Sequence, residues 1–298
     1  MVRLRTQGRR LIRALGLGLA LCLGSIAVAA PVGARDDRGH DIRLAQPARR
    51  VVALGPNLTE LVFAAGGGDR LVGVLRYSDF PAAARGLPVV GDAFALNFER
   101  IAQLKPDLIL AWHSGIPQRQ REQLQALGVP VFESEIRSVA GIADTLARLG
   151  TLLGTQPTAD AEAASLLRRW SALQERYAGR APVRVFYQLW HQPLMTINGE
   201  HLIAQAIAAC GGVDVFATLP SLTPTVSWEA AAQADPQVIV GARVVGRTVP
   251  DGRWPELETV DAVRHGRYAL LPPDLLSRMG PRFVDGAELL CEAIDKAR

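Results

Sequence analysis

Short apolar runs alternate with amphipathic stretches in the first half of the chain. β-Branched and apolar runs predict strands, and apolar residues at helical spacing predict the helices between them. The predicted strands are Arg50–Leu54, Leu71–Val74, Val89–Val90, Leu108–Trp112 and Val129–Phe132. The predicted helices lie near Thr59–Ala65, Phe98–Leu104, Gln118–Leu127 and Val139–Leu153. This alternation predicts α/β layers with mainly parallel strands.

The pattern changes between about Pro157 and Tyr177. This stretch has no internal Gly or Pro after Thr158, and its apolar residues predict one helix of about twenty residues, roughly 30 Å long. Alternation then resumes, with strands near Val183–Leu189, Val238–Val240 and Tyr268–Leu271 and helices near Leu202–Ala209, Ser227–Ala234 and Ala287–Lys296. The sequence therefore predicts two α/β lobes, at residues 48–152 and 182–298, joined by a linker helix at 153–181.

A short internal repeat supports this division. Glu99 is followed seven residues later by Pro106 and then by a buried-strand pattern, and Glu229 is followed by Pro236 at the same spacing. Both segments are typical of a helix, a proline-marked turn and a strand. The alternative is that two unrelated α/β turns share a common pattern.

Several single residues receive structural interpretations. Asn57 and Glu60 have the spacing of a helix N-cap and its capping-box partner. Trp170 and Tyr177 fall on the predicted linker helix and are interpreted as packing residues. Trp254 is expected to be a loop or surface aromatic residue.

The N-terminus has the pattern of a secretory signal peptide. Five arginines precede an apolar run from about Leu15 to Ala29, which ends in small residues. The run is shorter than the roughly 20 residues that span a membrane. We expect residues 1–30 to be cleaved and the exported mature protein to be soluble. An uncleaved anchor is the alternative, and the bulky Leu21 disfavours lipidation at Cys22.

Removing residues 1–30 changes the charge balance. The whole chain carries a formal charge of +4, from 33 basic and 29 acidic residues. The signal contains five arginines and no acidic residue, so the remainder is close to neutral. A near-neutral chain lacks the basic excess that binding a polyanion requires, which argues against a nucleic-acid partner.

Two cysteines remain after the signal, Cys210 and Cys291. In an oxidising compartment an isolated pair is best interpreted as a disulfide. Free thiols or metal ligation are the alternatives, but two cysteines without clustered histidines make a poor metal site. We therefore expect no metal centre.

Motifs for catalysis are missing from the sequence. It contains no P-loop, no dinucleotide-binding glycine fingerprint between a strand and a helix, no nucleophile elbow and no HExxH pair. An enzyme would need an acid–base site assembled from distant carboxylates. We expect a protein that is not an enzyme and has no cofactor.

Aromatic and polar residues gather at the predicted strand ends. In open α/β sheets, ligands bind beyond the carboxyl ends of the strands, and aromatic rings offer large contact area at a low entropic cost. Tyr187 occurs there too but is able to point into its own lobe. The candidates are Tyr77, Phe94, Trp112 and His113 in the first lobe and Trp190, His191, Asp274 and Arg278 in the second.

From about Arg50 onward the chain resembles the ABC-importer solute-binding family, whose members bind cobalamin, haem or iron-siderophores. The resemblance rests on these segments: residues 57–66 (NLTELVFAAG), 77–81 (YSDFP), 97–101 (NFERI), 104–108 (LKPDL), 111–112 (AW), 210–212 (CGG) and 281–282 (PR). The tyrosine turn, Trp112 and the two cysteines are similar to the cobalamin branch.

The resemblance implies two Rossmann-like lobes joined by one rigid helix, with a small-molecule ligand in the cleft between them. It implies that Tyr77, Trp112, Asp274 and Arg278 contact a corrin ring and that Cys210 and Cys291 form a disulfide. It also implies that Glu99 and Glu229 dock onto arginines of an ABC permease. The expected protein is a monomer that delivers cobalamin to this permease.

Two positions depart from the family. Ala93 and Thr223 occupy places where the cobalamin binder has tryptophan, although Phe94, Trp190 and His191 are candidates to compensate. A haem or iron-siderophore binder of the same architecture is the alternative, with Tyr77, His113 or His191 as axial ligands for haem. An exported α/β enzyme is the alternative from a different class.

Overall fold

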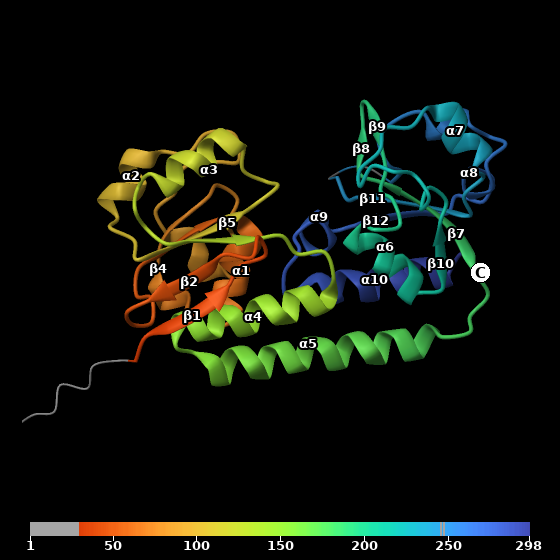
Figure 1. Cartoon of the computed structure of the whole chain (residues 1–298). Helices are drawn as coiled ribbons and strands as arrows, with labels where there is room; N and C mark the ends of the chain where they lie inside the picture. Colours follow the sequence, from red (N-terminus) through yellow and green to blue (C-terminus); the bar gives the residue numbers. More distant parts are fainter. Residues whose placement is uncertain (1–29, 245, 247) are drawn as a thin grey trace, which may run out of the picture.

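The structure, a computed structural model, describes residues 30–244, 246 and 248–298. Except for residue 30, the predicted signal peptide lies outside these residues. The chain forms two α/β lobes that lie side by side, with one long helix running beneath both (Figure 1). The predicted fold class is confirmed.

The first lobe contains a four-stranded parallel sheet. Its strands, in spatial order, are β4 (Leu71–Val74), β3 (Val51–Leu54), β5 (Leu108–Trp112) and β6 (Val131–Ser134). One face packs against α1 (Pro56–Ala64) and α4 (Val139–Leu153), and the other against α2 (Phe98–Gln103) and α3 (Gln118–Gln125). Both faces are covered, which explains why the strands are continuously apolar.

The second lobe repeats this arrangement. Its parallel sheet has the order β10 (Gly212–Asp214), β7 (Val183–Gln188), β11 (Val238–Ala242) and β12 (Tyr268–Leu271). The faces pack against α6 (Leu202–Ala209) with α10 (Phe283–Asp295), and against α7 (Trp228–Gln233) with α8 (Asp261–Arg264). In both lobes the strand order is second, first, third, fourth along the chain.

The internal repeat is present in three dimensions. Asn97 and Ser227 cap α2 and α7, each accepting a hydrogen bond from the backbone N–H three residues later. Lys105 and Asp235, the residues before the two prolines, both have positive φ, at 46° and 43°. The turn that follows Glu99 therefore has the same backbone form as the turn that follows Glu229.

The linker helix α5 (Gln156–Tyr177) packs against both lobes. It lies antiparallel to α4, and Gly150 allows their close contact because a Cβ there would lie 2.5 Å from the Cβ of Ala159. At the second lobe, Arg169 pairs with Asp285 and Glu288 of α10 at 2.5 and 3.0 Å. A helix anchored at both ends in this way behaves as a rigid spacer.

Some local elements differ from the sequence interpretation. The predicted strand at Val89–Val90 is only an isolated bridge between Val89 and Val74, because the chain turns away at Gly91, where φ is 136°. Two hairpins were not predicted: β1 (Val32–Arg35) with β2 (Asp41–Leu44), and β8 (Trp190–His191) with β9 (Leu194–Met195). Strands of two to four residues are too short to give a clear alternation.

The expected surface position of Trp254 is wrong. Trp254 is fully buried, packs edge-on against Phe186 and Trp228, and donates its indole N–H to Oε1 of Gln188 at 2.5 Å. Trp254 begins a short 3₁₀ helix, η3 (Trp254–Glu256), which packs onto the apolar residues of β7 and β11. The described residues contain no helix long and apolar enough to cross a membrane.

The predicted disulfide joins Cys210, at the end of α6, to Cys291 of α10. It closes a loop with a sequence separation of 81 residues. Replacing both cysteines with serine should lower the free energy of unfolding by about 3–4 kcal/mol, chiefly because the unfolded chain gains freedom. Guanidinium unfolding of the double variant and the oxidised wild type measures this difference. Equal unfolding free energies would contradict it.

Candidate functional site

A cavity of about 360 Å³ lies between the two lobes. The first lobe supplies Trp112, at the end of β5, and residues 135–137, directly after β6. The second lobe supplies Leu189, directly after β7, and Met279, which follows β12 and the short helix α9 (Pro273–Leu276). The carboxyl ends of both sheets therefore face one cleft, where ligands of open α/β sheets bind.

Trp112 forms a wall that two cavities share. It also lines an adjoining cavity of about 150 Å³ together with Asn57 and Arg278. Its ring lies against Gly115, where a Cβ would come within 2.1 Å of the indole. The indole Nε1–H is buried and has no hydrogen-bond acceptor among the described residues. An aromatic face is thus held in place at the lobe interface.

Three other predicted aromatic side chains project into solvent. Tyr77 is 73% exposed, Phe94 88% and Trp190 56%. Large aromatic side chains are usually buried, so their joint exposure at strand-end loops is typical of a ligand contact surface. Trp190 lies on β8, and the ring of His191 stacks beside it with centroids 5.4 Å apart.

The loops that carry Tyr77 and Phe94 are tied to each other and to α3. The backbone N–H of Arg76 donates to the carbonyl O of Gly91 at 2.9 Å. The Asp92 carboxylate accepts the backbone N–H of Phe94 at 3.0 Å, and Gln120 donates to the Phe94 carbonyl at 2.7 Å. These exposed rings are therefore presented by ordered loops.

His113 differs from the other candidates because its side chain is already bound within the first lobe. Its Nδ1 lies 2.5 Å from Oε2 of Glu133, a nearly buried carboxylate on β6. The guanidinium of Arg121 donates to the His113 carbonyl at 2.7 Å and lies 3.8 Å from the same Glu133 oxygen. This arrangement favours a structural role for His113.

Arg278 connects the two lobes through ion pairs. Its guanidinium donates to Oε1 of Glu60 on α1 at 3.0 Å and to Oδ1 of Asp79 at 2.8 Å, both in the first lobe. A third pair, at 3.0 Å, joins it to Asp274 of its own lobe. Arg278 lines the smaller cavity but is largely engaged by these carboxylates.

Glu60 is the centre of this network, and the sequence interpretation of it is wrong. Gly55 is the N-cap of α1 and no side chain caps this end, so Glu60 is not a capping-box partner. The Glu60 carboxylate is instead 3% exposed and accepts two hydrogen bonds from Arg282, at 2.9 and 2.6 Å. Arg282 also lies over the ring of Phe80, 3.8 Å from its centroid.

The network favours the charged forms of Arg278 and Asp79. Burial alone lowers the pKa of the Arg278 guanidinium, but hydrogen bonds to Asp79 and Glu60 outweigh this and raise it. Burial likewise raises the pKa of Asp79, whereas its bonds to Arg278 give a net lowering. The inter-lobe contact is therefore an ion-pair network at neutral pH.

Comparison with known proteins identifies the family. A model described as periplasmic binding protein matches residues 51–275. The chain is 37% identical over 248 residues to the vitamin B12-binding protein of Photorhabdus laumondii, covering 83% of this chain and 88% of the relative.

The chain belongs to the periplasmic binding protein family.

Solved structures agree with this assignment. The periplasmic vitamin B12 binding protein BtuF of Vibrio cholerae matches with a TM-score of 0.77 and 34% identity, covering 84% of this chain and 98% of that chain. A periplasmic heme binding protein from Pseudomonas aeruginosa matches with a TM-score of 0.72 and 27% identity, covering 83% and 92%. The relatives of this periplasmic binding protein are solute-binding proteins, and they include binders of vitamin B12 and binders of heme.

His201 is a cleft residue that the sequence analysis missed. It lines the larger cavity, caps α6 by accepting the backbone N–H of Ile203 on Nδ1 at 3.1 Å, and is nearly buried. Burial, reinforced by the nearby positive charge of Arg137, lowers its pKa to about 4. A histidine directly before an apolar helical run is a weak N-cap signal, and the sequence alone does not place it at the cavity between the lobes.

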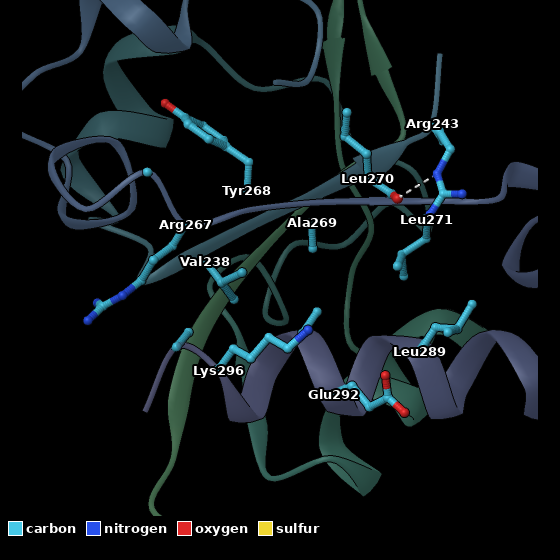
Figure 2. A pocket seen from close by; sticks show the side chains of 13 residues that line it. Val238, Arg243, Arg267, Tyr268, Ala269, Leu270, Leu271, Leu289, Glu292 and Lys296 are labelled. Carbon is cyan, nitrogen blue, oxygen red and sulfur yellow. Dashed lines mark hydrogen bonds between the residues drawn. The ribbon is translucent and has the colours of Figure 1, made fainter. Parts of the chain in front are cut away.

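A separate hollow of about 400 Å³ lies in the second lobe between β12 and α10. In Figure 2, Leu289, Glu292 and Lys296 line it from the helix, and Arg243 donates to the Leu270 carbonyl at 3.2 Å above. None of the predicted ligand-binding residues lines this hollow. Among the described residues, no group of three or more His, Cys, Asp or Glu side chains is placed to hold a metal ion.

The lowered pKa of His201 predicts a loss of stability in acid. The unfolded histidine titrates near 6.5 and the folded one near 4, so the stabilisation is present above pH 6.5 and is lost as the pH falls toward 4. This loss amounts to on the order of 3 kcal/mol. His201→Asn keeps a capping oxygen but does not titrate, so its unfolding free energy should fall less between pH 7 and 4.5.

Urea unfolding at the two pH values measures this difference. Burial raises the pKa of Asp214 to about 6, which makes its contribution change in the opposite direction, but this contribution is common to both proteins. If the unfolding free energies of wild type and His201→Asn fell equally between pH 7 and 4.5, the loss of stability in acid would not come from His201.

Proposed function

We propose that this protein captures cobalamin or a closely related corrinoid in the periplasm and delivers it to the permease of an ABC importer. The observation that supports this most strongly is the inter-lobe cleft lined by Trp112. Tyr77, Phe94 and Trp190 do not line this cavity, but each lobe exposes at least one of these large aromatic rings. A broad, flat ligand has the shape that such a set of rings can contact. The vitamin B12-binding relatives favour a corrinoid among flat ligands.

Within this proposal, the ligand contacts come from Tyr77, Phe94 and Trp112 in the first lobe and Trp190 and His191 in the second. Asp274 and Arg278 reach the ligand from the inter-lobe network, where Asp274 is half-exposed. Thr223 lies in the cavity wall and Ala93 is exposed. Phe94 and Trp190 replace the aromatic contact area that the family's tryptophans supply at positions 93 and 223. His113, paired with Glu133, contributes by holding the end of β5.

The proposal includes export and a role without catalysis. Residues 1–30 act as the cleaved signal, which directs the remaining chain to the periplasm as a monomer. The ligand is the transported cargo, so no resident cofactor is required. Haem is the second candidate, because Tyr77 and His191 are accessible and heme-binding relatives share the fold.

Glu99 and Glu229 are the proposed permease contacts. Both are exposed, and each is the second residue of its helix, in α2 and α7, at equivalent places in the two lobes. In Figure 1 both helices lie on the side of their lobes opposite α5. The backbone N–H of Glu229 and the Ser227 hydroxyl lower the pKa of the Glu229 carboxyl, which keeps it charged for docking.

Titration with cyanocobalamin should give sub-micromolar binding to the purified protein. Trp112→Ala should weaken this roughly 10- to 100-fold, because a buried aromatic contact at the centre of an interface is lost. Trp170→Ala, on the linker helix, is the matched control and should bind as the wild type does. An absence of binding at millimolar cyanocobalamin would sink the proposal, and a haem absorption band in protein from a haem-replete host would favour the second candidate.

Charge reversal at both docking positions should separate capture from delivery. Exposed rim charges contribute to orientation and encounter, so the Glu99→Arg and Glu229→Arg double variant should retain cyanocobalamin affinity and lose uptake in a transport assay. The matched control is Glu175→Arg, an exposed residue of α5, which should support normal uptake. Normal uptake by the double variant would contradict the docking assignment.

A further inference from the structure

The cavity between the lobes has more acidic than basic groups in its wall. Its charged lining residues are Glu135, Arg137 and Glu200. Glu135 is neutralised by Arg137, whose guanidinium donates to its carboxylate at 3.0 Å. Glu200 is exposed and has no ion-pair partner among the described residues. The wall therefore carries one unpaired carboxylate.

The guanidiniums of the neighbouring ion-pair network are already paired with carboxylates. Its carboxylates are Glu60, Asp79 and Asp274, and its guanidiniums are those of Arg278 and Arg282. A third guanidinium, that of Arg85, lies near Asp79 and donates to its carbonyl at 3.1 Å, so acids and bases balance here. Arg278 lines the smaller cavity but is paired with carboxylates, so a ligand against Trp112 meets no unpaired guanidinium among the described residues that line either cavity.

Two uncharged polar groups at the same place are hydrogen-bond donors. The Nδ1 of His201 accepts the backbone N–H of Ile203, so the neutral ring carries its proton on Nε2. His201 lines the cavity and is only 6% exposed, and no hydrogen-bond acceptor among the described residues occupies this Nε2–H. Within the same part of the chain, the Trp112 indole N–H is also without an acceptor. The low pKa of His201 keeps the ring a neutral donor at physiological pH.

We infer that the cleft selects ligands whose rim carries neutral hydrogen-bond acceptors, above all amide carbonyls, over ligands whose rim carries carboxylates. His201 donates a hydrogen bond to a rim amide, and Glu200 repels a rim carboxylate. This inference rests on the proposed function and names the chemical class that the same cleft accepts. A neutral donor satisfies an amide oxygen, whereas a carboxylate placed beside Glu200 brings like charges together.

The inference separates the two candidate ligands. The corrin rim of cobalamin carries amide side chains, whereas the rim of haem carries two propionates. Among the described residues, no unpaired cation lines the larger cavity, so a propionate there would lose its hydration without gaining a counter-ion. The cleft is therefore suited to the corrinoid.

The test compares ligands that differ by one group. Cyanocobalamin, a cyanocobalamin derivative with one rim amide hydrolysed to the carboxylic acid, and haemin are titrated separately at pH 7.5 and low salt. We expect cyanocobalamin to bind at least tenfold more tightly than a monocarboxylate whose acid group faces the second lobe, and haemin to bind most weakly. Added salt should reduce the difference in affinity between cyanocobalamin and the monocarboxylate derivative, because salt screens the repulsion between the ligand carboxylate and Glu200.

Three variants assign the effect to particular residues. His201→Asn keeps the helix cap but is too short to present the donor, so it should weaken cyanocobalamin binding roughly tenfold. His201→Gln keeps a donor at the same reach, so it should retain affinity within about threefold while lowering the thermal midpoint. Glu200→Gln should reduce the ratio of the affinity for cyanocobalamin to the affinity for the monocarboxylate derivative. Glu175→Gln, on α5, should leave this ratio unchanged.

The outcomes distinguish this inference from the proposed function. Equal affinities for cyanocobalamin and each monocarboxylate derivative, with His201→Asn unchanged, would overturn the inference and leave corrinoid capture standing. Failure of every corrinoid to bind, or tighter binding of haemin, would overturn both.

Discussion

The buried ion pairs from Glu60 to Arg278 and Arg282 fix the distance between the two lobes. These residues lie more than 200 positions apart in sequence, yet their side-chain atoms meet at 2.6 to 3.0 Å across the interface. Removing Glu60 would take the carboxylate partner from Arg282 and one of three carboxylate partners from Arg278, and the loss of a partner by a partly buried charge is costly. With α5 packed against both lobes, this contact holds the cleft open at a set width.

A cleft of fixed width has consequences for how the ligand binds. The exposed rings of Tyr77, Phe94 and Trp190 are already in place on ordered loops, and Trp112 is held against Gly115. Little conformational freedom remains to be lost on binding, so most of the contact energy appears as affinity. Closure around the ligand should then be small compared with that of hinge-type binders.

Much of the fold was predictable because it depends on local pattern. Strand ends such as Trp112 and the proline turns after Glu99 and Glu229 follow from residues a few positions apart, and the pairing of Cys210 with Cys291 follows from their compartment. Local pattern does not predict the roles of Glu60, His201 and Trp254, because these roles depend on residues far away in sequence. Glu60 has the spacing of a capping residue but pairs with arginines of the other lobe, and Trp254 is buried against strands of the sheet. His113 has the position of a ligand contact at a strand end, and only its contact with Glu133 on the next strand indicates a structural role.

The central claim is that a preformed cleft between the lobes holds a corrinoid. A crystal structure of the protein with bound cyanocobalamin tests it most directly. The account predicts a corrin ring between the lobes in contact with Trp112, an amide oxygen within hydrogen-bond distance of Nε2 of His201, and the Glu60 pairs intact. A ligand seated elsewhere, such as in the hollow between β12 and α10, or lobes that had separated at Glu60, would contradict it.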